Sequence, residues 1–66
     1  MGYVSYEKLF KLLDKKGLTR TELTKLSGIS TNMMAKLGKG ESVHISVLCK
    51  ICKTLDCGLD EIVEIL

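Results

Sequence analysis

Residues 18–40 read LTRTELTKLSGISTNMMAKLGKG, and this stretch decides the fold. Its apolar side chains recur at helical intervals, which predicts two short helices over 19–27 and 30–38. Between them stands Gly28, which accepts a positive φ without steric cost and so lets the chain turn sharply. Ile29 follows at once and is expected to fill the angle between the two helices. This is the physical pattern of a helix-turn-helix.

Hydroxyl side chains mark the beginnings of both helices. Thr19 and Glu22 have the spacing of a capping box, in which each side chain accepts a hydrogen bond from the other residue's backbone N–H. Ser30 is expected to be the N-cap of the second helix. The two helices should share an apolar seam, formed by Leu23, Ile29, Met34 and Leu37.

Helical spacing also predicts one helix before this stretch and two after it. The first should span 5–16, with Ser5 as its N-cap and Gly17 as the left-handed residue that ends it. The fourth should begin at Ser46 and the fifth near Gly58.

The coarse pattern predicts one all-α domain. Alternation typical of a strand is confined to residues 43–45, which is too short to carry a sheet. Five short helices without proline favour a compact five-helix bundle whose second and third helices form the helix-turn-helix. A chain of 66 residues has room for one such domain, over 1–66.

The composition argues against an enzyme and against a membrane or secreted protein. One His and no Trp leave little material for a catalytic pocket, and no cofactor is expected. No window approaches the roughly 18 apolar residues of a membrane span, and no signal peptide is visible. Three cysteines are too few and odd in number for a disulfide framework, so we expect a reduced, cytoplasmic protein.

The order of motifs resembles the Cro/C1-type (phage-repressor-like) helix-turn-helix family over nearly the whole chain. The matching phrases are Gly17-Leu18-Thr19, Glu22-Leu23, Gly28-Ile29-Ser30, Lys39-Gly40, the series Leu48, Ile51 and Leu55, and finally Leu59-Asp60-Glu61-Ile62. The resemblance implies a fold of the lambda-repressor-like type. This chain departs from the family at Arg20, where Gln is common, at Thr24, where Ala is usual, and at Gly38, where many members have Glu. Arg20 can still reach a phosphate, the Thr24 hydroxyl needs a partner, and Gly38 should weaken the end of its helix.

The resemblance implies that the third helix, about residues 30–38, enters the major groove of DNA. The exposed residues at the matching positions are Thr31, Asn32 and Lys36. Helical spacing places Thr31 and Asn32 on the face opposite Leu37, with Lys36 at its flank, whereas Met34 points inward. Asn pairs with adenine, Lys donates to guanine, and Thr contacts a base or a thymine methyl. Without the helix-turn-helix frame, a merely solvated helix face would be the better interpretation.

Four polar residues are candidates for the DNA backbone: Arg20, Ser30, Lys39 and Ser42. Phosphates accept hydrogen bonds from such side chains and from free N–H groups at helix N-termini. Exposure to solvent alone is a serious alternative for Lys39, and His44 in the following loop is equally open to either interpretation.

The C-terminal residues carry more large apolar side chains than one helix can bury in so small a core. The candidate dimer surface consists of Leu59, Ile62, Val63, Ile65 and Leu66. A homodimer would place two recognition helices about 34 Å apart, on successive half-sites. The alternative is that this end simply closes the core of the monomer.

The leading hypothesis is a sequence-specific regulator of transcription, a repressor, that binds double-stranded DNA. The alternative is a protein-interaction module with the same fold, such as an antitoxin or co-regulator, and a regulatory protein partner fits either hypothesis. A metal-sensing protein would rest on Cys49, Cys52, Cys57 and His44. Because Cys49 and Cys52 lie within a predicted helix, core packing is the better interpretation, and no metal is expected.

The charges are polarised along the chain. The net charge of +2 combines +6 over residues 1–53 with −4 over residues 54–66. This distribution favours an orientation with the cationic helices toward phosphate and the anionic end away from it.

Overall fold

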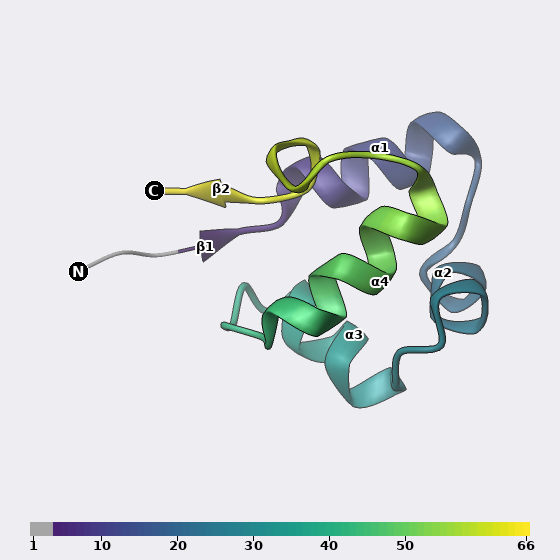
Figure 1. The fold of residues 1–66 in the computed structure, drawn as a ribbon, viewed down its shortest axis with the longest axis horizontal. Helices are drawn as coiled ribbons and strands as arrows, with labels where there is room; N and C mark the ends of the chain where they lie inside the picture. Colours follow the sequence, from purple (N-terminus) through teal and green to yellow (C-terminus); the bar gives the residue numbers. More distant parts are fainter. Residues whose placement is uncertain (1–3) are drawn as a thin grey trace.

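The computed structural model describes residues 4–66, which form four α-helices, one 3-10 turn and a pair of very short strands. The elements are β1 (Val4–Ser5), α1 (Glu7–Lys16), α2 (Arg20–Ser27), α3 (Thr31–Gly38), α4 (Ile45–Leu55), η1 (Leu59–Glu61) and β2 (Glu64–Ile65). Figure 1 shows α4 in the middle of the molecule, with α1 and η1 on one side of it and α3 on the other. The two strands lie together at one end of the molecule.

The helix-turn-helix forms as predicted, and its capping is confirmed. Thr19 Oγ1 accepts a hydrogen bond from the backbone N–H of Glu22 at 3.1 Å, and Glu22 Oε1 accepts one from the N–H of Thr19 at 3.0 Å. Gly28 has a φ of 76°, in the left-handed region, and turns the chain between α2 and α3. Ser30 Oγ then accepts from the N–H of Met33 at 3.2 Å. The N-termini of α2 and α3 are therefore capped by the side chains of Thr19 and Ser30.

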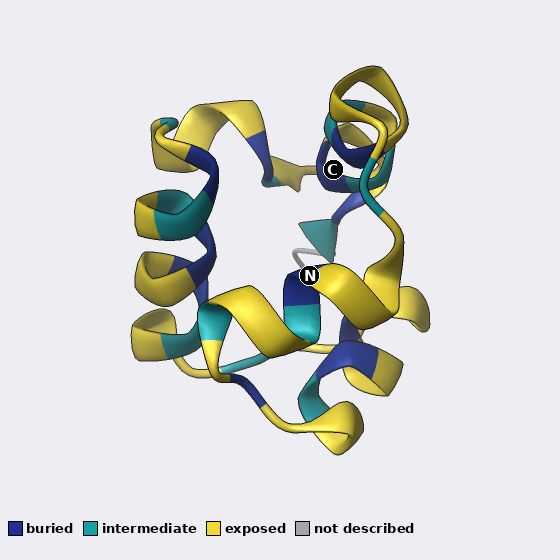
Figure 2. Ribbon diagram, turned by 90° about the vertical axis from the view of Figure 1, so that its right-hand side faces the viewer, coloured by how far each residue is buried: buried dark blue, intermediate teal, exposed yellow. Residues whose placement is uncertain are grey.

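Side chains from all four helices and from the segment after η1 meet in one core. Figure 2 shows the buried positions of the helices turned toward one another and the exposed positions turned outward. The largest fully buried side chains are Leu9, Leu23, Leu37, Ile51 and Ile62. The predicted seam between α2 and α3 is entirely buried. Because α2 packs against both α3 and α4, the core holds the helix-turn-helix rigidly on the central helix.

The start of α1 differs from the prediction. Its N-cap is Tyr6, without a side-chain capping bond, and the predicted N-cap Ser5 belongs to β1. Ser5 pairs with Glu64, and the Tyr6 side chain is buried in the core. These two tertiary contacts outweigh the capping preference of serine. The predicted end at Gly17 is confirmed, with a φ of 71°.

The fourth helix begins one residue before its predicted start. His44 is the N-cap of α4, and its Nδ1 accepts a hydrogen bond from the N–H of Ser46 at 3.2 Å. The imidazole thus accepts a hydrogen bond from a backbone N–H in the first turn of α4, which has no partner within the helix. The helix ends at Leu55 and is followed by Asp56, which has a φ of 53°.

The predicted fifth helix is not confirmed: residues 4–66 are mostly helical, with four α-helices in place of the five predicted. After Gly58 the chain forms only the 3-10 turn η1 and then the strand β2, which pairs antiparallel with β1. The pairs are Val4 with Ile65 and Ser5 with Glu64. Short helices are marginal in water, and the β-branched residues of this segment suit an extended chain. Burial of Ile62 in the core and pairing with β1 therefore favour an extended conformation over a helix for this segment.

The helices are short throughout, and the longest is α4 with 11 residues. Within residues 4–66, no helix is both long enough and apolar enough to cross a membrane.

Candidate nucleic-acid interface

Helix α3 presents its predicted base-reading residues to solvent. Thr31, Asn32 and Lys36 are all exposed, and within residues 4–66 none of their side chains makes an intramolecular hydrogen bond. Their amide, hydroxyl and ammonium groups are the types that read base edges in a major groove. The structure thus brings the three onto one helix, with their polar groups available to a ligand.

The opposite face of α3 anchors it to the core. Met34 and Leu37 are buried, and Met33 is half-buried against the core cluster. Met33 therefore packs along the flank of α3. A helix held in this way presents its exposed face at a fixed orientation.

Arg20 occupies the first position of α2 and is exposed. Its guanidinium carbon lies 4.1 Å from the centroid of the Phe10 ring, which comes from α1. A cation over an aromatic face at this distance is attracted by the ring. The backbone carbonyl of Arg20 accepts a hydrogen bond from Thr24 Oγ1 at 2.9 Å, which gives the Thr24 hydroxyl the partner it needs.

An open surface hollow of about 290 Å³ joins Arg20 to the end of α3. Its lining includes Arg20, Phe10, Gly38, Lys39 and the carboxylate-bearing Glu7. We call this feature the Arg20 hollow. Two of the predicted phosphate residues, Arg20 at the start of α2 and Lys39 directly after α3, therefore border one depression. Glu7 is an acid at the same rim, so the charge there is mixed.

The loop after α3 carries Lys39 and Ser42, two of the four residues predicted to contact DNA phosphates. Lys39 and Ser42 are exposed on either side of Glu41. The Tyr6 hydroxyl donates a hydrogen bond to the carbonyl oxygen of Glu41 at 2.9 Å and so ties this loop to the start of α1. His44 caps α4, which gives this side chain a structural role that the sequence interpretation left open.

Sequence reasoning missed two residues that shape this region, Phe10 and Gly38. Helical spacing predicts Phe10 only as a member of the apolar face of the first helix, with Leu9 and Leu13, and Gly38 is expected only to weaken the end of its helix. In the structure, a Cβ at position 38 would lie 3.1 Å from Nη1 of Arg20. The signal available in the sequence was that Arg20 and Gly38 both depart from the family pattern.

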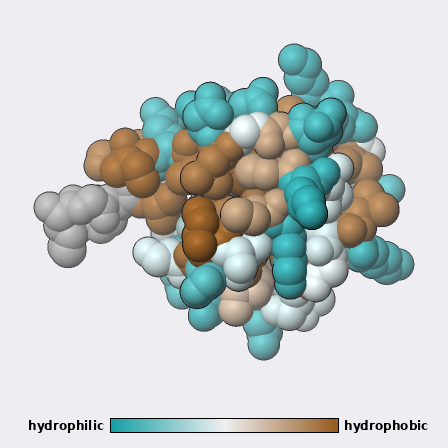
Figure 3. Space-filling model, in the orientation of Figure 1, coloured by the Kyte–Doolittle hydropathy of each residue, from teal (hydrophilic) through white to brown (hydrophobic). Residues whose placement is uncertain are grey.

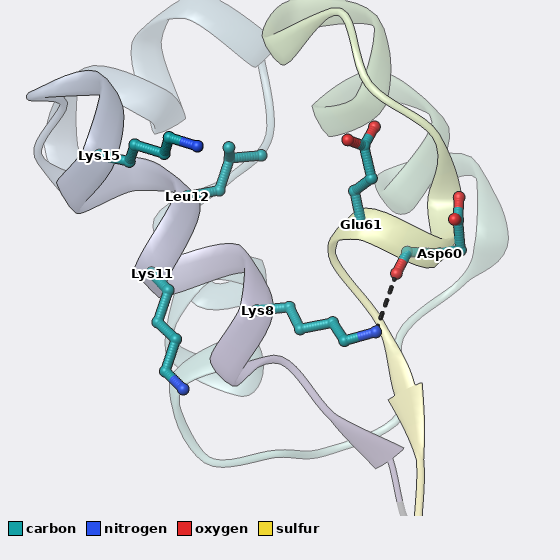
Figure 4. A pocket seen from close by; sticks show the side chains of 6 residues that line it. All are labelled: Lys8, Lys11, Leu12, Lys15, Asp60 and Glu61. Atoms are coloured by element: carbon teal, nitrogen blue, oxygen red, sulfur yellow. Dashed lines mark hydrogen bonds between the residues drawn. The ribbon is translucent and has the colours of Figure 1, made fainter.

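The acidic end of the chain lies beside α1. Lys8, Lys11 and Lys15 border one side of a shallow hollow, and Asp60 and Glu61 of η1 border the other (Figure 4). Lys8 Nζ donates a hydrogen bond to the backbone carbonyl oxygen of Asp60 at 3.2 Å. In Figure 1, η1 and α3 lie on opposite sides of α4. The lysines of α1 therefore neighbour the acidic segment rather than α3.

Apolar side chains gather at the end of the molecule where β1 and β2 lie (Figure 3). Ile65 and Leu66 are 72% and 71% exposed, and Leu59 is 42% exposed. Val63 is half-buried, whereas Ile62 is fully buried in the core of its own chain. The predicted dimer surface thus divides, because Ile62 belongs to the monomer core and the other four residues reach the surface. Leu59, Val63 and Ile65 border one surface hollow, whereas Leu66 borders the Arg20 hollow. We call these four residues together the C-terminal patch.

Cys52 and Cys57 are neighbours, but His44 and Cys57 lie at opposite ends of α4. His44 precedes α4 and Cys57 follows it, and a helix of 11 residues is about 16 Å long. The three cysteines are free thiols, and residues 4–66 contain no group of three side chains arranged to hold a metal ion. Burial raises the pKa of the Cys57 thiol to about 11, and the neighbouring Cys52 thiol adds to the rise.

Two comparisons with known proteins find this helix-turn-helix fold elsewhere. Residues 8–66 match the family model of the Cro/C1-type HTH DNA-binding domain. The crystal structure of the transcriptional regulator VanUg, form II, superposes with a TM-score of 0.95 at 43% sequence identity. The alignment covers 98% of this chain and 87% of that chain. No curated protein sequence matches significantly.

Proposed function

The chain belongs to the Cro/C1-type HTH DNA-binding family, and from that premise we propose that it is a sequence-specific repressor of transcription. Helix α3 enters the major groove of double-stranded DNA, with Thr31, Asn32 and Lys36 on the base edges. The observation that carries the proposal is the position of these three exposed side chains, opposite the buried anchors of α3 in a capped helix-turn-helix. Its similarity to a solved transcriptional regulator supports the same conclusion.

In this proposal the backbone of the DNA is held by Arg20, Ser30, Lys39 and Ser42. Ser30 accepts a hydrogen bond with its Oγ within the helix cap, so its hydroxyl proton can donate to a phosphate. Arg20 and Lys39 supply the positive charge of the Arg20 hollow. Such contacts set the register on the duplex without reading sequence.

The repressor acts in the cytoplasm as a homodimer that joins two chains through the C-terminal patch. Three of its four side chains are exposed to solvent in the monomer. Contact with a second chain would bury this apolar surface, which favours association. A single small module buries only about 600–1,000 Å² on DNA. Two modules on adjacent half-sites double the base contacts, and each occupied operator then blocks transcription by occupancy alone.

Binding to selected and to mixed-sequence duplexes tests the proposal. A preferred duplex is first enriched from a random library, and fluorescence anisotropy then measures Kd for both duplexes at 50 and 200 mM salt. The wild-type protein should prefer the enriched duplex, and its affinity for both should fall steeply with salt. Asn32→Ala and Lys36→Ala should lower the preference by about tenfold each, as loss of a base contact worth about 1–3 kcal/mol requires.

Arg20→Ala and Lys39→Ala are the matched variants for backbone contacts. Each should weaken binding to both duplexes alike and lower the salt slope by about one. Absence of binding to any duplex at low salt would exclude DNA as the ligand and favour the protein-interaction alternative. Equal behaviour of all four variants would show that the assignment of base and phosphate roles is wrong.

Sedimentation equilibrium tests the dimer separately. Ile65→Asp and Leu66→Asp should shift the protein toward monomer, because each places a charge in the proposed apolar contact. Lys25→Asp is a control for a charge change at an exposed position of α2. A wild-type protein that stays monomeric at high concentration and on its preferred duplex would overturn the dimer proposal.

A further inference from the structure

We propose that Phe10 and Gly38 are positioning residues that hold Arg20 ready for a DNA phosphate. This inference rests on the proposed function and adds two residues to it that do not touch the DNA themselves. It starts from one arrangement: the guanidinium group of Arg20 lies over the Phe10 ring and beside the bare backbone of Gly38.

The aromatic contact orients the guanidinium without using its hydrogen-bond donors. The Arg20 guanidinium carbon is 4.1 Å from the ring centroid, and the attraction acts through the face of the ring. A guanidinium carries its five N–H donors around the edge of its plane. Within residues 4–66, no side-chain hydrogen bond occupies those of Arg20. The group is therefore held in place with its edge free for the two parallel bonds that a phosphate accepts.

Gly38 supplies the space that this position requires. A Cβ there would lie 3.1 Å from Nη1 of Arg20, closer than ordinary van der Waals contact. Gly38 is the last residue of α3 and is not in the left-handed region, so its backbone does not require glycine. Glycine at position 38 thus leaves room for the Arg20 side chain and is not required by the backbone conformation at the end of α3.

Phe10 is itself firmly placed. It is half-buried and packs against the core cluster, while its neighbour Leu9 is fully buried. A ring fixed in this way can reduce the rotamer freedom of an exposed arginine before DNA arrives. Ordering a long side chain on binding opposes affinity, so an arginine that is already ordered should bind phosphate more tightly. Lys39 at the same hollow has no such support from a ring.

A double-mutant cycle on DNA binding tests the role of Phe10. Phe10→Leu keeps an apolar side chain in the core and removes the ring face. It should weaken binding to the enriched and the mixed-sequence duplex alike, by about two- to fivefold, the strength of an exposed cation–π contact. In an Arg20→Ala background, the same change should have no further effect. Phe10→Tyr keeps the ring and should restore most of the affinity.

Gly38→Ala gives a second readout with opposite signs for stability and binding. Alanine is the better helix former, so the melting temperature should stay the same or rise. The new methyl group should push the Arg20 guanidinium a few tenths of an ångström away from its position beside residue 38. It should weaken DNA binding measurably but less than Phe10→Leu does, because the ring remains. Leu12→Ala removes a half-buried side chain elsewhere on α1 and controls for general loosening, since it should lower stability and leave DNA affinity unchanged.

The outcomes separate this inference from the proposed function. An equal loss for Phe10→Leu in both backgrounds would make Phe10 a purely structural residue and overturn the inference, while DNA binding by the wild type would leave the proposed function intact. Wild-type affinity in Gly38→Ala would likewise overturn it. A wild-type protein that binds no duplex would overturn both.

Discussion

The Tyr6 hydroxyl and the carbonyl oxygen of Glu41 lie 2.9 Å apart and form a hydrogen bond that joins the start of α1 to the loop after α3. Burial raises the pKa of the Tyr6 phenol, so the hydroxyl keeps its proton well above neutral pH. Through this bond the core holds the segment that presents Lys39 and Ser42. The loop is therefore a fixed part of the candidate interface.

Tyr6→Phe should cost about 1 kcal/mol of stability, because it removes this hydrogen bond and keeps the buried ring. For a domain of this size that is a fall in melting temperature of about 4–8 °C. Thermal unfolding followed by circular dichroism gives the shift. A change below 1 °C would mean that the bond contributes nothing, since the packing of the ring is unchanged.

Thr19→Ala should destabilise α2 by about 1 kcal/mol, because Thr19 accepts the capping hydrogen bond from the N–H of Glu22. Thr21→Ala is a matched control, since Thr21 is an exposed threonine in the first turn of the same helix. Urea unfolding of the two variants compares them directly. Ala is a better helix former than Thr, so Thr21→Ala should not destabilise α2. Equal destabilisation by both variants would therefore mean that the loss does not come from the cap.

Leu23→Ala should leave the domain largely unfolded at 25 °C. Leu23 is fully buried between α2 and the central helix, and replacing such a side chain by Ala costs about 2–5 kcal/mol. A domain of this size rarely has more than about 3–5 kcal/mol in total. Leu26→Ala removes a leucine from the same helix that is 63% exposed and should cost little. Far-ultraviolet circular dichroism distinguishes the two.

Stability should fall between about pH 9 and pH 11, and Cys57 should contribute to the fall. Its pKa is raised to about 11 in the folded chain, mainly by burial, so the unfolded chain loses the thiol proton at lower pH. Below both pKa values each state is protonated and the contribution is complete; it is lost as pH rises through the folded value. Cys57→Ala should therefore show a smaller loss of melting temperature from pH 8 to pH 10.5 than the wild type.

Cys49→Ala is the control for this pH dependence, because Cys49 is exposed on α4. It should lose as much melting temperature over the same range as the wild type. If Cys57→Ala also follows the wild type, the alkaline fall belongs to other groups, such as the buried Tyr6.

The parts of the fold that could be predicted from sequence are those decided by local rules. The capping box of Thr19 and Glu22, the left-handed Gly17 and Gly28, and the N-cap Ser30 all depend on residues within a few positions of one another. The apolar seam between α2 and α3 follows from helical period alone. For the same reason, the exposure of Thr31, Asn32 and Lys36 could be foreseen.

The parts that could not be predicted depend on residues distant in sequence. The extended β2 exists because β1 pairs with it, and no local pattern distinguishes Ile65 on a strand from Ile65 on a helix. The sequence does not show which of the C-terminal apolar residues is buried, because the burial of Ile62 depends on packing against residues distant in the chain. The contact of Arg20 with Phe10 and Gly38 joins three helices, so neither helical period nor capping rules could reveal it.

The pairing of β1 with β2 has a kinetic consequence. Val4 and Ile65 are 61 positions apart in the chain, whereas the helices and their caps form from neighbouring residues. Closing so long a loop costs chain entropy before the hydrogen bonds between the two strands can stabilise the structure. The helices should therefore assemble first, and the β1–β2 pair should form last and open first. A terminal fusion or tag that disturbs this strand pair should speed local opening at Ile62 without altering the order in which the helix-turn-helix folds.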